Sequence, residues 1–387
     1  MATSITITLY SAGTFGFDIL PLAVVTPLSW SVAKKVNDVN IATVRVNFQK
    51  YGGVDITTGQ FIIIEREDIA NGMAEYVEFV GMIRKYKVIQ GADTIIEFVA
   101  VDGMHILQDR LVAWYPDLPG YSTFSSVTYP KASSVLAQLW NTNLGQDSGN
   151  PPVVSAALTR RYGTSLNRWA DGQVILAQTF ATDYDVGSAV NYSCSGENLL
   201  TAMQKVADAG GIDFWVDIYN QEYGFFEYTL YAAVNRGVDR TAYVKMSQEN
   251  NTLGTLDRTV DILNSPSYII ANGTGKNKAR IHGGYPAVVP EDLALREAFV
   301  NGADNTTVAQ LNVIATRRWL QEQRKVQSYN IEVLQSSVYR YGRDYFLGDL
   351  VTAVWNGATT LTRKVYGVTL GMDSSGNERV QIDLVAN

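Results

Sequence analysis

The chain has 387 residues, of which 46% are hydrophobic and 18% are charged. This composition supplies enough apolar side chains for folded cores and excludes an intrinsically disordered chain, and the length predicts two or three packed units. The net charge is −7 and no Lys/Arg run exceeds the two residues of Arg317-Arg318, which argues against a nucleic-acid-binding protein. Cys194 is the only cysteine, which excludes an intrachain disulfide and a cysteine-ligated zinc site.

The N-terminal residues lack the basic stretch and apolar run that mark a signal peptide. No window approaches the ~20 apolar residues that a membrane-spanning helix needs. The most apolar candidate, Ile19–Trp30, is interrupted by Pro21 and Pro27. We therefore expect a soluble protein that is made in the cytosol and has no membrane span.

The first part of the chain reads as consecutive short strands. In Ile5–Tyr10 the apolar residues alternate with polar ones, which places Ile5 and Leu9 on one face. Turn-forming pairs such as Asn71-Gly72 separate the runs, and this spacing is typical of a closed or nearly closed barrel. The other strands are predicted at Thr43–Phe48, Phe61–Glu65, Tyr76–Arg84, Tyr86–Gln90 and Thr94–Val101, and a short helical turn at residues 102–110 leaves the barrel.

From Lys131 the pattern changes to that of an α+β unit. The clearer of its two helices has Ser195 as a plausible N-cap and Gly210-Gly211 as a stop signal. The predicted elements are helices at Ala132–Trp140 and Ser195–Asp208, a loop at Gly145–Gly172, and strands at Ile212–Tyr219 and Phe225–Ala233.

The last part of the chain combines helices with strands. Its stronger helix, Thr306–Lys325, carries an apolar stripe and basic residues near its end, which suit a helix packed on a barrel. The other predicted elements are strands at Thr255–Asp261, Tyr268–Ala271, Tyr329–Leu334, Leu350–Trp355, Arg363–Gly371 and Arg379–Leu384, a loop at Asn272–Gly284 and a helix at Glu291–Asn301.

Little in the sequence supports catalysis. His105 and His282 are the only histidines, the first on a predicted helix and the second in a glycine-rich loop, and such isolated histidines do not suit a His-based triad or a zinc site. The loop Asn272–Asn277 lacks the pattern of a phosphate-binding loop, because Ile270 stands at the position of the first glycine and Asn277 follows the lysine.

Paired carboxylates would be the signature of a glycosidase. Asp213 and Asp217 share one face of a predicted strand, but four residues at ~3.3 Å each separate them by ~13 Å, beyond the ~5–9.5 Å that such catalysis uses. Asp183 and Asp185 have the pattern of turn residues. The charged run at residues 65–68 is expected to be a solvated strand end.

The most informative segment is Tyr339–Thr352, which reads Y-G-x-D-Y-x-L-G-D-x-V and leads directly into a predicted strand. Its two glycines allow backbone turns that a β-branched residue would resist. This segment resembles the baseplate hub, or tail-tip, proteins of long-tailed bacteriophages, the siphophage hubs related to the central hub of contractile-tail baseplates. Residues Asp102–Arg110 are similar to a weaker motif of that family. The motif residues are Tyr341, Gly342, Asp344, Tyr345, Leu347, Gly348 and Asp349.

The resemblance implies an α+β, β-rich fold with two tail-tube-like β-barrel domains at the chain ends and an α+β insertion between them. The expected units are an N-terminal hub barrel at 1–130, the insertion at 131–250, and a helix plus C-terminal hub barrel at 251–387. The resemblance further implies a virion structural component, not an enzyme, with no catalytic residues, cofactor or metal. Three chains are expected to form a pseudo-sixfold ring at the tail tip, through which DNA is ejected.

The partners that the resemblance implies are the distal tail protein, the tape measure protein and tail-tip fibre or spike proteins. DNA is expected to pass through the ring without stable binding. Two alternatives remain open at this point: a tail-associated peptidoglycan or carbohydrate hydrolase, and the sixfold distal tail protein. The chain has no room for an appended hydrolase or receptor-binding domain of the kind that larger hubs carry, so these functions are expected on other chains.

Overall fold

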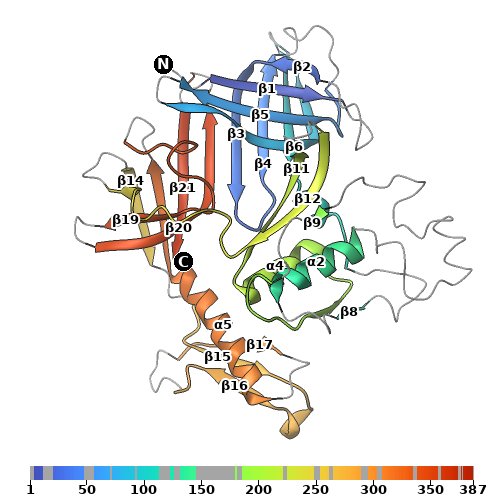
Figure 1. The fold of residues 1–387 in the computed structure, drawn as a ribbon, viewed down its shortest axis with the longest axis vertical. Coiled ribbons are helices and arrows are strands. Elements are labelled where there is room, and N and C mark those ends of the chain that lie inside the picture. Colours follow the sequence, from blue (N-terminus) through green and yellow to red (C-terminus); the bar gives the residue numbers. More distant parts are fainter. Residues whose placement is uncertain are drawn as a thin grey trace, which may run out of the picture.

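A computed structural model shows a large β-sheet with a helical unit on one side and a small protruding unit at one end (Figure 1). Most of the described strands belong to one 13-stranded sheet, accompanied by one two-stranded and two three-stranded sheets. The structure describes residues 4–11, 21–47, 56–69, 72–91, 94–112, 123–125, 131–144, 179–180, 185–220, 225–247, 253–260, 265–288, 295–302, 307–333, 338–355, 359–373, 376 and 378–386.

The N-terminal strands of the large sheet include two that the sequence did not predict, at Pro21–Val25 and Pro27–Lys35. Both begin with a proline, a position where the missing N–H and the fixed φ do not disturb the ladder, so these prolines start strands instead of breaking one apolar run. The strands are β1 (Ser4–Tyr10), β2 (Pro21–Val25), β3 (Pro27–Lys35), β4 (Ile41–Asn47), β5 (Phe61–Asp68), β6 (Met73–Ile89) and β7 (Ile95–Val101).

Strand β6 is one long strand where the sequence predicted two. Its first half pairs with β5 as far as Met82, and its second half pairs with β7 from the same residue onward. A register irregularity falls between Ile83 and Lys85. Because a bulge bends a strand and increases its twist, β6 can pass from one group of strands to the other without a break.

The C-terminal strands extend the same sheet. They are β13 (Lys245–Met246), β14 (Leu253–Val260), β18 (Gln327–Val333), β19 (Leu350–Trp355), β20 (Thr359–Met372) and β21 (Glu378–Ala386). The sheet order is β14-β18-β21-β20-β3-β4-β7-β6-β5-β1-β2, with β19 on β20 and β13 on β19. The first and last parts of the chain are joined where β20 pairs with β3, from Gly367 opposite Lys35 to Met372 opposite Trp30.

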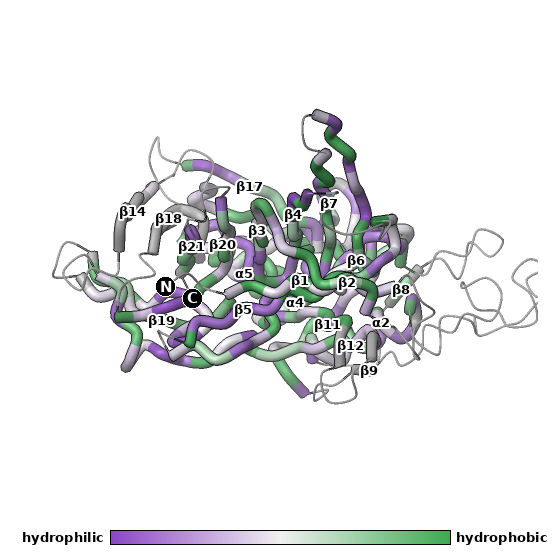
Figure 2. The backbone as a smooth tube through the Cα atoms, turned by 90° about the horizontal axis from the view of Figure 1, so that it is seen from above, coloured by the Kyte–Doolittle hydropathy of each residue, from purple (hydrophilic) through white to green (hydrophobic). Residues whose placement is uncertain are grey.

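One hydrophobic core serves both groups of strands. It holds Ile7, Val44 and Phe98 from the N-terminal strands together with Val368 and Ile382 from the C-terminal ones, each at most 2% exposed. Seen from above, hydrophobic and hydrophilic segments are interspersed over the strands (Figure 2). Among the described residues no pairing closes either group into a barrel, so the β-rich α+β class is confirmed and the two barrels are not.

The helical unit packs against the large sheet through a second core. Its longer helices, α2 and α4, lie against each other and against the hairpin β11–β12 (Figure 1). Helix α4 is capped by Asn198, whose side chain accepts a hydrogen bond from the Thr201 amide, while the predicted cap, Ser195, ends strand β10. The elements are α1 (His105–Gln108), β8 (Thr123–Ser125), α2 (Ala132–Asn143), β9 (Thr179–Phe180), β10 (Ser193–Ser195), α4 (Leu199–Gly210), β11 (Asp213–Asn220) and β12 (Phe225–Ala233). The predicted loop 145–172 lies outside the described residues.

The protruding unit consists of a three-stranded sheet covered on one face by helix α5. The helix that the sequence predicted at 291–301 is wrong: residues 291–294 are not described, and 297–301 form a strand that pairs in parallel with β15. Alternating burial there fits a strand with one covered face, and this tertiary pairing overrides the local helical pattern. The elements are β15 (Tyr268–Asn272), the 3-10 turn η5 (Asn277–Ala279), β16 (His282–Tyr285), β17 (Glu297–Asn301) and α5 (Val308–Val326). Within the described residues, no helix has the length and apolarity that crossing a membrane requires.

Candidate functional site

The motif segment forms a compact turn that is packed into the large core. The Gly342 amide donates to the Tyr345 carbonyl at 3.1 Å, and the Asp344 amide donates to the Arg340 carbonyl at 2.9 Å. The rings of Tyr341 and Tyr345 meet edge to face at 5.8 Å, and both residues are at most 1% exposed. The motif is therefore a piece of the core and not an exposed loop.

Both motif glycines occupy backbone conformations that favour glycine. Gly342 has φ of +90° and Gly348 has φ of +92°. A Cβ atom on Gly342 would lie 2.4 Å from the Tyr76 hydroxyl, and one on Gly348 would lie 2.7 Å from the Gly237 amide nitrogen. Because each position combines a positive φ with a close neighbour, any other residue would be strained and would displace an adjoining segment.

Asp349 ties the motif to the segment that follows β12. Its carboxylate accepts hydrogen bonds from the Val238 amide at 2.7 Å, the Phe346 amide at 2.8 Å and the Arg240 guanidinium at 2.6 Å. The side chain is 2% exposed. Hydrogen bonds to a charged carboxylate are stronger than those between neutral groups, so Asp349 joins two backbone segments, residues 238–240 and the motif turn at 346–349.

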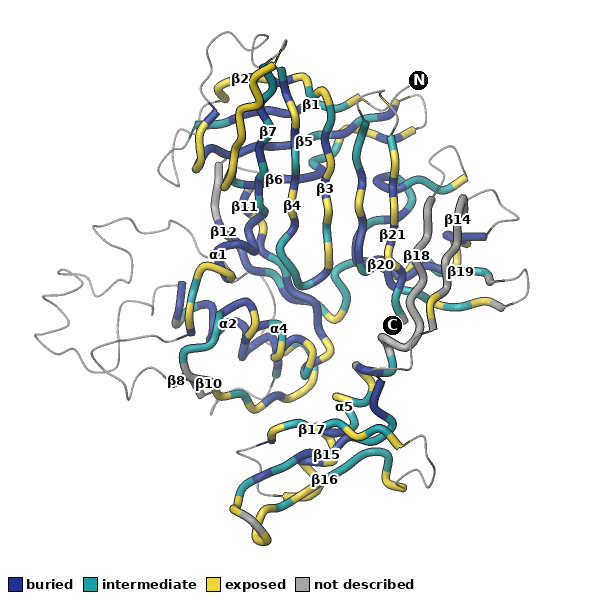
Figure 3. Tube along the Cα trace, turned by 180° about the vertical axis from the view of Figure 1, so that it is seen from behind, coloured by how far each residue is buried: buried dark blue, intermediate teal, exposed yellow. Residues whose placement is uncertain are grey.

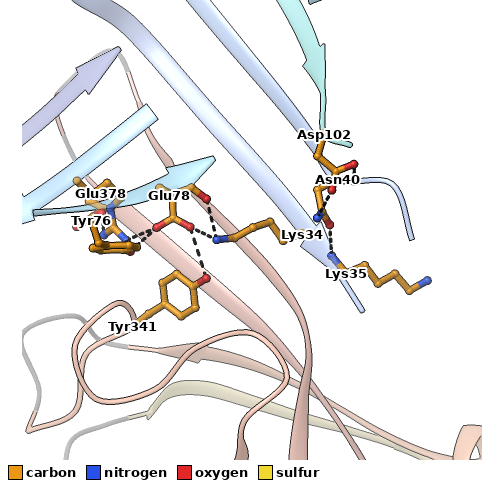
Figure 4. Close-up of polar contacts among 9 residues, drawn as sticks. Lys34, Lys35, Asn40, Tyr76, Glu78, Asp102, Tyr341 and Glu378 are labelled. Carbon is orange, nitrogen blue, oxygen red and sulfur yellow. Dashed lines mark hydrogen bonds and ion pairs between the residues drawn. The ribbon is translucent and has the colours of Figure 1, made fainter. Parts of the chain in front are cut away.

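A cluster of buried charges lies next to the motif (Figure 4). The Glu78 carboxylate on β6 is paired with the Lys34 ammonium from β3 and with the Arg66 guanidinium from β5, the latter at 2.9 Å. Tyr76 donates its hydroxyl proton to the same carboxylate, and the Tyr341 hydroxyl lies 3.5 Å from it. The side chain of Glu78 has no exposed surface and that of Arg66 is 1% exposed.

The protonation states of this cluster follow from burial and from the neighbouring charges. Burial opposes ionisation of Glu78, but Lys34 and Arg66 outweigh it and hold its pKa below the ordinary value. Burial lowers the pKa of Lys34 in spite of Glu78, and burial raises the pKa of Tyr341. Glu78 is therefore ionised and Tyr341 neutral at pH 7, which suits a permanent ion pair rather than a proton-transfer group.

The cluster connects distant parts of the sequence. Arg66 also pairs with Glu378 at the start of β21, and Arg340 of the motif pairs with Asp68 at 2.8 Å. The run at 65–68, expected to be solvated, thus contributes two buried residues, Arg66 and Asp68. The expectation was wrong because a charged strand end looks the same in sequence whether its partner is water or another strand.

The helical unit has its own buried ion pair with the large sheet. The Lys364 ammonium of β20 contacts both carboxylate oxygens of Asp213 of β11, and the Arg236 amide donates to the same carboxylate at 2.7 Å. Asp213, which the sequence analysis considered as one of two catalytic carboxylates, therefore forms a structural ion pair. Its sequence partner Asp217 is exposed on the same strand.

A cavity of about 690 Å³ lies where the motif, the β6 strand and the β11 strand meet. Its wall includes Lys34, Tyr76, Glu78, Asp102, Arg236 and Asp349. Lys34 and Tyr76 both bond Glu78, and Asp349 bonds Arg240, which also lines the cavity. Asp102 accepts hydrogen bonds from the Asn40 amide and side chain and from the Met104 amide, and burial raises its pKa to about 7. The cavity is thus lined by groups that hold segments together.

The two histidines and the remaining acidic residues considered for catalysis are not brought together into a site. His105 is 5% exposed, and its Nδ1 lies 2.5 Å from the Asp102 carbonyl. His282 begins strand β16 instead of lying in a loop, and it is exposed. Asp185 pairs with Lys131 at 4.0 Å, and Asp183 lies outside the described residues. Among the residues that the structure describes, no group of three potential metal ligands comes together.

Sequence reasoning found the motif but missed the residues that surround it. Lys34, Arg66 and Glu78 come from three strands whose pairing the sequence does not state, and two of these strands were predicted incompletely or not at all. The available signal was a charged residue among apolar ones on one face of an alternating strand, as at Glu78, which shares its face with Tyr76 and Val80.

The described residues form a β-rich scaffold whose segments are joined by buried ion pairs. The chain belongs to the Siphovirus ReqiPepy6 Gp37-like protein family, whose model matches residues 25–384. No curated protein sequence matches the chain.

Solved structures with the same fold include phage tail proteins and a component of a type VI secretion system. A tail protein from Neisseria meningitidis MC58 is 11% identical, with a TM-score of 0.60 over 99% of this chain and 97% of that one. The 43 kDa tail protein of prophage MuSo2 from Shewanella oneidensis is 11% identical, with a TM-score of 0.58 over 98% of each chain. The E. coli c3393 protein, a type VI secretion component with structural similarity to the T4 tail proteins gp27 and gp5, is 9% identical, with a TM-score of 0.50 over 94% of this chain and 74% of that one. The resemblance to tail hub proteins that the sequence indicated is confirmed.

Proposed function

We propose that this protein is a baseplate hub of the phage tail tip, a non-enzymatic virion component. Three copies form a ring that joins the sixfold tail tube and distal tail protein to the threefold tip and leaves a pore for DNA ejection. The observation that carries the proposal is the pairing of β3 with β20, which sets an N-terminal and a C-terminal group of strands side by side in one sheet. Three such chains supply six groups of strands, which a pseudo-sixfold ring needs.

The free edges of the sheet support this assembly. Among the described pairings, β14 pairs only with β18, and residues 84–89 of β6 pair only with β7. These edges lie at opposite ends of the run β14-β18-β21-β20-β3-β4-β7-β6. An unpaired edge is a template for another strand, and a head-to-tail contact between unlike edges closes into a ring when the rotation fits. The edge of one copy therefore joins the opposite edge of the next.

The domain division belongs to the same proposal. Residues 1–130 and 251–387 act as the two hub domains, and residues 131–250 form the insertion between them. In this proposal the two domains act as one unit, because their strands share a hydrophobic core. The distal tail protein and the tape measure protein contact one side of the ring, and fibre or spike proteins contact the other.

The test is a cross-linking experiment on the purified chain. In a Cys194→Ser background, single cysteines are placed across residues 85–89 and, in the same chain, across residues 253–259. Because the two edges lie far apart in one copy, a disulfide forms between copies. A covalent product of three chains that does not grow further supports the hub ring. Six chains would point to the sixfold distal tail protein instead, and a stable uncross-linked monomer would remove the proposal.

Two further measurements separate the remaining alternatives. The purified ring is expected to release no soluble fragments from peptidoglycan or polysaccharide, whereas measurable release would favour the hydrolase. With a net charge of −7 in each copy, the ring is also expected to show no affinity for duplex DNA at physiological salt, because its overall negative charge repels the phosphate backbone. Tight, salt-sensitive DNA binding would contradict this reading of the charge.

A further inference from the structure

The three-stranded sheet of the protruding unit has one covered face and one open face. Helix α5 covers the first: Ile269 and Ala271 of β15 pack on Leu311 and Ala315, all with no exposed surface. The alternate residues of each strand point the other way. They form what we call the open face: Tyr268, Ile270, Asn272, His282, Gly284, Glu297, Phe299 and Asn301. The unit lies at the end of the molecule farthest from β1 and β2, with α5 between this sheet and the rest (Figures 1 and 3).

Strand register sorts the open face into an apolar row and a polar row. Ile270 lies opposite Gly284 on one side and Phe299 on the other, and Phe299 is 58% exposed. The Tyr268 hydroxyl lies over Gly284, where a Cβ atom would be only 2.3 Å from it. The middle of the face is therefore apolar: the Tyr268 side chain lies across Gly284, and the exposed Phe299 ring offers a surface on which a flat ligand can pack.

The polar row crosses the same three strands two residues further along. Asn272 lies opposite His282 and Asn301. The His282 Nδ1 lies 2.5 Å from the Asn272 side-chain oxygen, which fixes both side chains on the open face. Adjacent strands are ~4.8 Å apart, so amide and imidazole groups stand at regular intervals. Such a row suits a ligand that carries several hydroxyl groups.

A basic loop borders the polar row. Residues 273–281, which connect β15 to β16, contain Lys276, Lys278 and Arg280 and no acidic residue. All three cations are exposed, and within the described residues they form no ion pair. The only acidic residue of the open face, Glu297, lies at the opposite end of β17, opposite Tyr268. This charge is local, because the chain as a whole carries −7.

We propose that the open face and its basic loop bind an acidic polysaccharide of the bacterial surface. The apolar face of a sugar ring packs on Phe299, its hydroxyls bond the row of Asn272, His282 and Asn301, and its phosphate or carboxylate groups pair with the loop cations. Charge complementarity favours an acidic over a neutral polymer. Three cations in an acidic chain, beside an exposed aromatic ring, favour a polysaccharide over a nucleic acid. The choice of a surface polymer rests on the proposed role at the tail tip.

The test uses the full chain and immobilised polymers. The probes are wall teichoic acid for phosphate groups, alginate for carboxylate groups, dextran as a neutral polysaccharide and a short DNA duplex. We expect binding to one or both acidic polymers and weaker or no binding to dextran and DNA. Phe299→Ala and the double variant Lys276→Ala/Lys278→Ala should each weaken binding by at least about tenfold, and only the double variant should lower its salt dependence.

Matched controls keep the result interpretable. Val288→Ala removes a side chain that is 77% exposed in the same unit, and Lys245→Ala removes an exposed lysine of the large sheet; both should bind like the parent chain. Thermal unfolding verifies that each variant is folded. Absence of binding to both acidic polymers, equal binding by Phe299→Ala, or tighter binding to DNA would overturn the inference. Ring mass is measured on the same samples, so loss of the ring with intact polymer binding would refute the hub assembly and leave the inference standing.

Discussion

The Lys364 ammonium lies 2.5 and 2.7 Å from the two carboxylate oxygens of Asp213, although the residues are 151 positions apart. The pair joins strand β20 of the large sheet to strand β11 of the helical unit, and both side chains are at most 10% exposed. A buried ion pair of this kind fixes the position of the helical unit on the sheet, because burying either charge without its partner would lower the free energy of unfolding.

Lys364→Met tests this anchor. The substitution leaves the Asp213 carboxylate buried without its cation, so we expect a loss of ~3 kcal/mol in the free energy of unfolding. Urea unfolding of the purified chain measures it. Arg45→Met provides the control, since its pair with Glu97 is exposed and should be worth less than ~1 kcal/mol. Equal effects of the two variants would show that the buried pair does not anchor the helical unit.

Gly348→Ala should destabilise the motif by more than ~1 kcal/mol. The new Cβ would meet the Gly237 amide nitrogen at 2.7 Å in a backbone of positive φ. Gly72→Ala separates the two causes, because Gly72 also has a positive φ, of +75°, but its Cβ would meet nothing within 4 Å. A Gly348 variant no less stable than the Gly72 variant would rule out the close contact as a constraint.

Asp349→Ala should cost ~3 kcal/mol, because it leaves two part-buried amides and the Arg240 guanidinium without their acceptor. Asp344→Ala is the comparison within the motif. The Asp344 side chain is 26% exposed, so water can take over some of its hydrogen bonds, and the loss in the free energy of unfolding should be smaller. Chemical unfolding ranks the two variants, and the reverse order would contradict the central place given to Asp349.

Glu78→Gln should show a pH-dependent loss of stability. The pKa of Glu78 is lowered in the folded chain, so its stabilisation is present above the unfolded value of ~4.3 and disappears as pH falls through the folded value. The variant should be ~3 kcal/mol less stable at pH 7, and the difference should shrink below about pH 4. Glu97→Gln, in the exposed pair with Arg45, should show little difference at either pH. A pH-independent deficit for Glu78→Gln would contradict the ion-pair account.

Asp102 should give the opposite pH trend. Burial raises its pKa to about 7 in the folded chain, against ~3.9 in the unfolded one. Between these values the folded chain holds a proton that the unfolded chain has released, so stability falls as pH rises, by at most ~1.4 kcal/mol per pH unit. Asp102→Asn should remove this slope, and Asp109→Asn, with a 44% exposed side chain, should keep it. Denaturant midpoints between pH 4 and 7 decide the matter.

The sequence by itself determined what depends on neighbours along the chain. Alternation placed strands such as β1, β19 and the β11–β12 hairpin, and the two motif glycines are read from local turn chemistry that Gly348, at φ of +92°, bears out. Strands β2 and β3 were not predicted from the sequence, although Pro21 and Pro27, noted there only as interruptions of an apolar run, each begin a strand.

Only the tertiary structure decided which distant residues meet. The pairing of β3 with β20, the contact of Arg66 with Glu378 and that of Lys364 with Asp213 join residues from opposite parts of the chain. The open face also depends on tertiary structure. Asn301 lies opposite Asn272 because residues 297–301, which the sequence predicted as part of a helix, form a strand parallel to β15. Strand pairing and buried ion pairs depend on how distant segments fit together in three dimensions. No local sequence pattern states which distant residue will pair with a buried charge.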